Sequence, residues 1–297
     1  MAGELRSSWK MKRRVKMLSD CRISGFADEI NKDFDIQLSV LKELGQEYVE
    51  LRSADGTGVA DLSLEMASEL GERMKAAGIR VSSVGSPIGK IKITDDFEPH
   101  FETYRHVVEL AKLWGVRYIR MFSFYIPEGE DPAQYKEEVF SRMKRMVDYA
   151  VEQDVVLLHE NEKEIYGDIA SRCLELMEAF YGDHFKGVFD FANFVQCGQD
   201  TLEAYEMLKP YIFYIHIKDA LQEDGEVVLP GDGDGNVKEI LSMLDSSGYK
   251  GFLSLEPHLV SFDGLDKLEQ GARVRREQDG VSAYKKAHGR LIELLGR

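Results

Sequence analysis

The chain has 297 residues, of which 43% are hydrophobic, and it carries a formal net charge of −15. This length supports a sizeable core in one or two domains, while the acidic charge argues against a nucleic-acid partner, because phosphate-backbone binding relies on clustered lysine and arginine. Three scattered cysteines without a CxxC spacing, and no apolar run of membrane-spanning length, predict a cytoplasmic protein with reduced thiols.

Strand-like and helix-like segments alternate along the chain. Eight short runs rich in β-branched and aromatic residues predict strands at 22–27, 48–53, 79–85, 116–124, 155–160, 187–192, 213–220 and 252–256. Between them apolar residues recur at helical spacing, and glycines follow several of the helical runs. Eight strand–helix units predict an α/β protein with a single (β/α)₈ TIM barrel. A doubly wound open sheet is the alternative, and it is disfavoured because polar residues follow many strands rather than one switch point.

Two segments fall outside this alternation. Residues 1–20 are basic and lack the apolar stretch of a signal peptide, so we expect an N-terminal tail before a barrel domain at 21–297. Residues at about 259–283 are rich in Asp, Glu and Arg and predict a polar insertion after the eighth strand. The sequence leaves the oligomeric state open, and a homo-oligomer is compatible with it.

Four consecutive predicted strands close on a residue that can bind a metal. Glu160, Asp190, His216 and Glu256 end strands five to eight, and the carboxyl ends of neighbouring barrel strands meet at one rim. Three carboxylates packed together would raise one another's pKa values, and a divalent cation removes that conflict. Hard oxygen donors favour Mn²⁺ or Mg²⁺, with Zn²⁺ or Co²⁺ as alternatives. We therefore expect one divalent ion at this rim.

Four motifs resemble the sugar phosphate isomerase/epimerase family of the xylose-isomerase-like barrel superfamily: ENEKEIYGD (160–168), FDFANF (189–194), HIKDA (216–220) and LEPHL (255–259). The resemblance spans about residues 21–295. It implies that Glu160, Asp190, His216 and Glu256 bind one divalent metal, and that the two glutamates are the catalytic acid and base. The family often has histidine where this chain has Asn193, which leaves the substrate and the contact at that position open.

Weaker candidates surround these four residues. Lys218 and His258 each lie two residues beyond a predicted ligand and are candidates to bind substrate, as are Asn193 and Arg120; ion pairing of Lys218 with Asp219 or Glu223, and a loop hydrogen bond for His258, are the alternatives. Glu162 is an alternative ligand to Glu160. Glu50, Arg52 and Arg120 end strands two and four and are expected to bind substrate or to pair with one another, with structural pairing favoured for Arg52. The GDGDGN run at 231–236 fits neither a phosphate loop nor a calcium loop and is interpreted as a flexible connection.

These features predict a metal-dependent isomerase or epimerase of a sugar, sugar phosphate or keto-polyol. A metal that chelates the carbonyl and neighbouring hydroxyl oxygens would stabilise an enediolate, and a carboxylate would move the proton. A lyase or dehydratase acting on a keto-polyol is the nearest alternative, since it begins with the same proton abstraction. An endonuclease-IV-like enzyme would need more histidines and less negative charge, and a non-catalytic sugar-binding protein would not need the metal ligands. A small carbohydrate is the expected partner, with no nucleic acid and no membrane.

Overall fold

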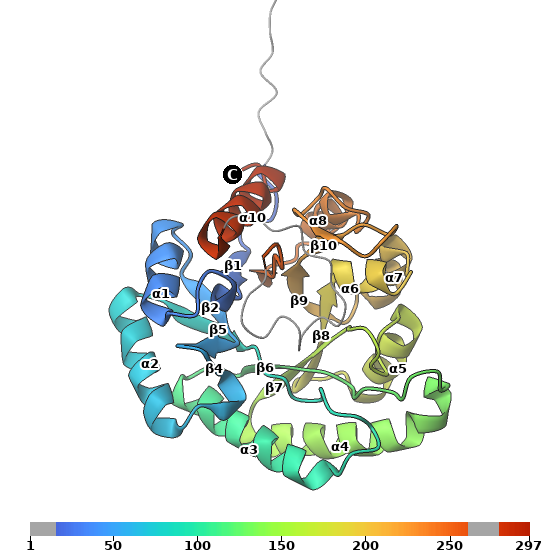
Figure 1. Cartoon of the computed structure of the whole chain (residues 1–297). Coiled ribbons are helices and arrows are strands. Elements are labelled where there is room, and N and C mark those ends of the chain that lie inside the picture. Colours follow the sequence, from blue (N-terminus) through green and yellow to red (C-terminus); the bar gives the residue numbers. More distant parts are fainter. Residues whose placement is uncertain (1–15, 261–278) are drawn as a thin grey trace, which may run out of the picture.

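Eight parallel strands form a nearly closed barrel inside a ring of helices (Figure 1). The computed structural model describes residues 16–260 and 279–297. The strands are β1 (Arg22–Gly25), β2 (Tyr48–Leu51), β5 (Arg80–Val84), β6 (Tyr118–Met121), β7 (Val156–Glu160), β8 (Phe185–Asp190), β9 (Ile212–Ile217) and β12 (Phe252–Leu255). They are hydrogen-bonded in the order β1-β12-β9-β8-β7-β6-β5-β2, and β1 and β2 lie side by side where the sheet closes. The predicted barrel is confirmed.

The outer ring consists of helices that alternate with the strands (Figure 1). They are α1 (Phe34–Glu43), α2 (Leu64–Ala77), α3 (Phe97–Leu113), α4 (Lys136–Gln153), α5 (Ala170–Phe180), α7 (Thr201–Leu208), α8 (Val237–Ser246) and α10 (Gly280–Leu294). The side chains of Asp33, Ser63, Asp96, Asp200 and Asp279 accept hydrogen bonds from the first turns of the helices that they precede. Such caps satisfy backbone N–H groups that have no partner within a helix.

Short elements decorate the barrel mouth and the loops. They are the 3₁₀ helices η1 (Ala27–Glu29), η2 (Val59–Asp61) and η3 (Pro132–Tyr135), the helix α6 (Phe191–Gln196), and the two-residue strand pairs β3 (Ser53–Ala54) with β4 (Thr57–Gly58) and β10 (Asp219–Ala220) with β11 (Val227–Val228). In the described part of the chain, no helix combines the length and apolar character needed to cross a membrane.

Each strand presents one face to the helices and one to the barrel interior, because successive side chains of a strand alternate in direction. Outward residues such as Leu157, Phe189 and Ile215 belong to the main hydrophobic core. Inward residues form a second, smaller cluster made of Val156, Leu158, Val188, Tyr214 and Phe252. This cluster fills the start of the barrel, so the inward positions that follow it along β7, β8, β9 and β12 are available for polar side chains.

Seven of the eight predicted strands run one to three residues past their observed carboxyl ends, and β7 alone ends where predicted. β8 ends at Asp190, because the Asp190 carboxylate accepts a hydrogen bond from Asn193 N at 2.7 Å and starts α6 at Phe191. β9 ends at Ile217, and Asp219 and Ala220 turn away to pair antiparallel with β11. Most of the predicted tail and of the polar insertion lies outside the described residues, although Leu18 is buried and its amide donates to Asp245.

Candidate metal centre

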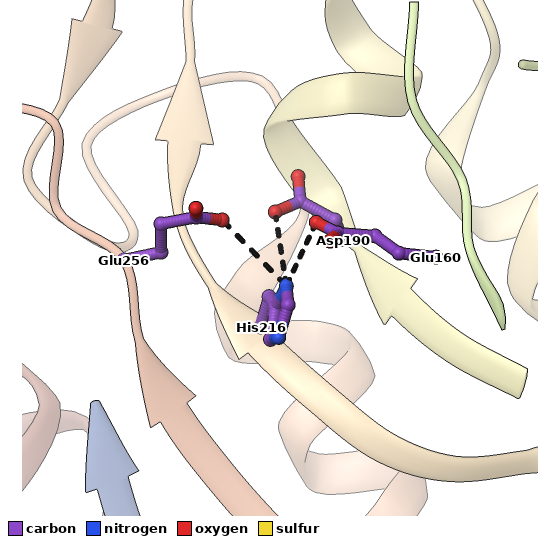
Figure 2. A group of neighbouring side chains, drawn as sticks. All are labelled: Glu160, Asp190, His216 and Glu256. Atoms are coloured by element: carbon purple, nitrogen blue, oxygen red, sulfur yellow. Dashed lines mark hydrogen bonds and ion pairs between the residues drawn. The ribbon is translucent and has the colours of Figure 1, made fainter. Parts of the chain in front are cut away.

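The four predicted ligands meet inside the barrel at the carboxyl ends of β7, β8, β9 and β12 (Figure 2). The register places Asp190 beside His216, and His216 beside Ser254, which lies two residues before Glu256. Glu160, Asp190, His216 and Glu256 are all buried, and one potential ligand atom from each lies within 4.8 Å of the others. Parity and register together account for this convergence.

His216 presents its Nδ1 atom to the three carboxylates. The distances from His216 Nδ1 to Glu160 Oε1, Glu256 Oε2 and Asp190 Oδ2 are 2.8, 3.6 and 4.0 Å. Figure 2 shows Glu256 on one side of the imidazole nitrogen and Glu160 on the other, with the Asp190 carboxylate between them. Burial lowers the pKa of His216, but the charges of Glu160 and Glu50 outweigh it and hold that pKa well above the ordinary value.

The carboxylates have the donor chemistry that a divalent cation requires. Burial, reinforced by Glu160 and Glu256 against the opposing charge of Lys218, raises the pKa of Asp190 to about 7. Among the described residues, Asp190 Oδ2 is buried and accepts no hydrogen bond. A buried carboxylate oxygen without a hydrogen-bond donor is costly unless a cation compensates it, and the Lys218 ammonium, 3.5 Å away, does so in part. Three carboxylate oxygens and one imidazole nitrogen therefore fit a divalent ion of the Mn²⁺ or Mg²⁺ type, and also Zn²⁺.

Two cationic side chains flank the cluster. Lys218 Nζ lies 3.5 Å from Asp190 Oδ2 and 3.4 Å from Glu256 Oε2. Arg120 donates to Glu160 Oε2 at 3.2 Å and to the Gly85 carbonyl. Burial raises the pKa of Glu256, but Lys218 and the two neighbouring histidines hold it well below the usual range. Lys218 therefore pairs with two of the predicted ligands and not with Asp219 or Glu223, the alternative considered from the sequence, because β9 ends at Ile217 and Asp219 turns away with β10.

A second buried charged group shares Glu256 with the first. Glu29, Glu256 and His258 also bring potential ligand atoms within 4.8 Å of one another. The Arg52 guanidinium lies among them, at 2.9 Å from Glu256 Oε1 and 3.3 Å from Glu29 Oε1, and it also pairs with Asp28 at 2.8 Å. This group therefore already contains a cation, the Arg52 guanidinium. The observed pairing agrees with the structural role predicted for Arg52.

His258 has an unusual backbone. It adopts a φ of 45°, in the left-handed region that residues other than glycine rarely occupy. Its amide donates to Glu29 Oε2 at 2.7 Å, and its Nε2 atom lies 3.3 Å from Glu256 Oε1. Strained residues of this kind persist where the surrounding contacts hold them in place, and here those contacts bring the imidazole to the edge of the cluster.

The GDGDGN segment is anchored, which corrects its interpretation as a flexible connection. The Asp219 carboxylate accepts hydrogen bonds from the amides of Gly231, Gly233 and Gly235 at 2.8 to 3.0 Å. A Cβ atom at Gly233 or Gly235 would lie 2.6 Å from Asp219 Oδ1, so the close approach of the loop backbone to the Asp219 carboxylate requires glycine at both positions. Because Asp219 follows Lys218 directly, these hydrogen bonds connect the loop to the end of β9.

Asn193 contacts the cluster of four candidate ligands, whereas Glu162 lies outside it. Asn193 Nδ2 donates to the Asn161 carbonyl at 2.9 Å and to Glu160 Oε1 at 3.4 Å. Within the described residues, Asn193 Oδ1 is buried and has no hydrogen-bond donor. Glu162 instead pairs with Lys90 at 2.9 Å and does not belong to the four-ligand group.

Three charged residues near the cluster escaped prediction. Asp28 and Glu29 lie in η1, just after β1, and Lys90 lies in the loop after β5. Asp28 and Glu29 carry the same signal that pointed to the four candidate ligands, namely charged residues at or directly after the end of a barrel strand. Lys90 lies six residues beyond β5, and its partner Glu162 belongs to another loop, so no spacing in the sequence connects the two.

Comparison with known protein families identifies this arrangement. The family model described as the xylose isomerase-like TIM barrel matches residues 38–278, which is most of the chain. The chain belongs to the xylose isomerase-like TIM barrel family. The predicted resemblance is thereby confirmed at the level of this superfamily, and the observed (β/α)₈ barrel agrees with it.

Individual relatives of this xylose isomerase-like protein are distant. A 3-dehydroshikimate dehydratase of Bacillus anthracis is 22% identical over 134 residues, or 45% of this chain and 48% of that protein. The match therefore spans about half the length of this curated relative. The solved structure of an L-ribulose 3-epimerase has a TM-score of 0.73 at 18% identity, covering 93% of this chain and 94% of that one. The IolI protein, solved with a zinc atom bound, has a TM-score of 0.71 at 16% identity, covering 92% and 98%.

Proposed function

We propose that the protein is a divalent-metal-dependent isomerase or epimerase that moves a proton next to the carbonyl of a sugar or related hydroxylated ketone. The observation that carries the proposal is the buried group of Glu160, Asp190, His216 and Glu256 at the barrel mouth. The structural similarity to an epimerase over almost the whole chain supports it, as does the zinc atom bound in a neighbour of the same fold.

The four side chains would hold the ion. When bound, it would act as a Lewis acid that polarises a substrate carbonyl and stabilises the enediolate formed by loss of a proton. Glu160 and Glu256 enter from strands on different sides of His216 (Figure 2). We assign one of them to remove the proton and the other to return it. Burial of both side chains keeps bulk water away from them.

The flanking cations suit an anionic intermediate. Lys218 and Arg120 partly offset the charges of the three carboxylates, and a dication would add two positive charges at the same place. Developing negative charge on the substrate is stabilised best by charges that are already fixed in place. Lys218, held between two ligands, is the candidate to stabilise a substrate oxygen, and Asn193 Oδ1, Arg120 and His258 are the candidates to bind hydroxyl groups.

A dehydratase is the second candidate, because the relative that matches 134 residues is a 3-dehydroshikimate dehydratase. Its reaction would start with the same abstraction of a proton next to a carbonyl. The intermediate would then break a carbon–oxygen bond, and protonation of the leaving hydroxyl would release water. The same acid and base residues serve both reactions, so product analysis has to separate them.

The test is a screen of ketoses and keto-polyols in deuterated water with added Mn²⁺, followed by NMR. An isomerase or epimerase incorporates solvent deuterium into a rearranged product, whereas a dehydratase yields a product with a new carbon–carbon double bond. Incorporation of deuterium that is lost on chelation supports the proposal. A metal-loaded protein that exchanges no substrate proton in the whole screen would contradict it.

The two glutamates can be tested separately. We expect Glu160→Gln and Glu256→Gln to lower turnover by about 10²–10⁴-fold, the usual contribution of general acid–base catalysis, while one variant still exchanges a proton from one epimer only. Glu164→Gln, at an exposed position of the loop after β7, is the matched control. Metal content is measured in each variant. Near-normal turnover in either metal-loaded variant would rule out the two-carboxylate mechanism.

A further inference from the structure

The second ring nitrogen of His216 has a buried carboxylate partner across the barrel. Nε2 lies 3.1 Å from Oε2 of Glu50, and both side chains have no exposed surface. Glu50 belongs to β2, at one end of the sheet order, whereas His216 belongs to β9 near the other end. This contact therefore crosses the barrel interior, and it replaces the pairing with an arginine or the substrate contact considered for Glu50 from the sequence.

Neighbouring groups fix both partners. Ser254 donates its hydroxyl to the same Glu50 oxygen, Oε2, at 2.7 Å. The imidazole packs edge-on against Phe26 and Tyr214, with ring centroids 5.2 and 5.7 Å apart and interplanar angles of 78° and 86°. The ring plane is therefore set by packing, and the direction of its two nitrogens by Glu50 on one side and Glu160 on the other.

We propose that Glu50 is a positioning residue for the metal centre, which acts through His216 and does not itself bind the ion. A neutral imidazole carries one N–H. Without an ion, both ring nitrogens face a carboxylate oxygen, Nδ1 at 2.8 Å from Glu160 and Nε2 at 3.1 Å from Glu50. With an ion held by Glu160, Asp190 and Glu256, the imidazole would be neutral, and Glu50 would keep the one proton on Nε2, so that Nδ1 could offer its lone pair to the ion. Histidine ligands commonly donate their other N–H to a carboxylate, which fixes the ring and raises its basicity. This inference rests on the proposed metal site.

The experiment measures metal affinity, not activity. Wild-type protein, Glu50→Gln and Glu50→Leu are titrated with Zn²⁺ and with Mn²⁺ in competition with a chelator. Partners of this kind contribute about 10–100-fold to metal affinity. We expect about a hundredfold weaker binding in Glu50→Leu, which lacks the acceptor, and about tenfold in Glu50→Gln, which keeps an uncharged one. The graded loss follows the acceptor, which a merely space-filling role would not produce.

Ser82→Ala is the matched control. Ser82 is buried in the same interior and is hydrogen-bonded to Ser24, Tyr214 and the Val49 carbonyl. Its loss therefore disturbs buried hydrogen bonds near His216 without removing a partner of the imidazole. We expect its metal affinity to stay within about threefold of wild type. An equal loss in Ser82→Ala and in the Glu50 variants would overturn the proposal, since the effect would then be a general one.

The remaining outcomes separate this inference from the proposed function. A wild-type protein that binds neither metal removes the proposed function and this inference with it. Binding by wild type that both Glu50 variants match within about threefold overturns only the role of Glu50. Circular dichroism shows whether Glu50→Leu is folded, and where it is not, Glu50→Gln decides: a tenfold loss supports the proposal, and unchanged affinity rejects it.

Discussion

The Lys218 ammonium would stabilise an anionic intermediate, but it would also compete with a metal ion for the same carboxylates. Its ammonium lies between Asp190 and Glu256, within 3.5 Å of each. A dication that uses the same two carboxylates is repelled by this charge at short range. In the proposed mechanism the same charge would favour turnover, because it would stabilise a substrate oxygen that becomes negative. Metal binding and turnover should therefore respond to Lys218 in opposite directions.

We expect Lys218→Met to bind Zn²⁺ at least as tightly as wild type and to lose turnover by about 10²-fold, the usual effect of removing one group that stabilises a developing anion. Chelator competition and steady-state kinetics on the same preparation provide the two measurements. Lys250→Met, at an exposed lysine paired with Asp20, is the control and should change neither. Weaker metal binding in Lys218→Met would contradict the assignment, because the lysine would then support the ligands.

His159 is a buried histidine outside the metal centre. It precedes Glu160 on β7 but points to the opposite face, where Nε2 lies 3.0 Å from Ser123 Oγ. Burial lowers its pKa to about 3. A lowered folded-state pKa favours the neutral form, so its contribution to stability is full above the unfolded value of about 6.5 and is lost as the pH falls towards 3.

We expect His159→Gln to remove this acid sensitivity. Between pH 6 and pH 4 the unfolding free energy of wild type should fall by about 1.4 kcal/mol per pH unit more than that of the variant, because only unfolded wild type gains the proton. Urea unfolding of metal-free protein at several pH values measures the difference between the two curves. Parallel curves would show that His159 titrates normally in the folded protein.

At the level of elements, the end of β9 and the loop before α8 behave as one unit. Asp219 accepts three amides of the GDGDGN segment, and His216 and Lys218 immediately precede it. The amide of Asp234 also donates to the Ala220 carbonyl, at 2.8 Å. Disturbing the loop should therefore reach the metal centre through the backbone of 216–219.

A pair of glycine-to-alanine substitutions tests this coupling. In Gly235→Ala the new Cβ would lie 2.6 Å from Asp219 Oδ1 and 3.0 Å from Phe191 Cβ, whereas Gly289 in α10 has open space around it. We expect Gly235→Ala to cost about 1–3 kcal/mol and to weaken metal binding. Gly289→Ala should stabilise by about 0.5–1 kcal/mol with unchanged metal binding. Chemical denaturation and metal titration measure both, and equal stability of the two variants would contradict the anchored loop.

At the level of the whole molecule, the last helix closes the barrel. Tyr284 of α10 is fully buried, and its hydroxyl accepts a hydrogen bond from Gln46 Nε2 at 3.0 Å, just before β2. The same hydroxyl fills the space above Gly25 of β1, where a Cβ atom would lie 2.0 Å from it. One side chain thus bridges the two strands at the ends of the sheet.

We expect Tyr284→Ala to destabilise the protein by about 3–5 kcal/mol, as for other large aromatic residues in cores. Tyr284→Phe keeps the ring and loses only the hydrogen bonds to the Gln46 amide, at a cost of about 1 kcal/mol. Thermal or urea unfolding ranks the two variants against wild type. A small effect of Tyr284→Ala would mean that β1 and β2 stay together without this side chain of α10.

The sequence by itself determined the architecture and the four candidate ligands. Alternating strands and helices favour a parallel barrel, and parallel strands bring their carboxyl ends to one rim, so Glu160, Asp190, His216 and Glu256 converge without knowledge of any distance. Boundaries were less certain, because the capping of α6 by Asp190 and the turn after Ile217 override apolar runs that continue through them.

Only the tertiary structure decided which partner each buried charged side chain has. Whether Arg52 pairs with Asp28 and Glu256, which nitrogen of His216 faces Glu50, and what Asp219 binds all depend on groups from distant segments that lie within about 3 Å. Strand parity sets the face from which a side chain projects, but not its partner across the barrel. That partner follows from strand order, register and the rotamers that the packed interior allows, and these exist only in the folded chain.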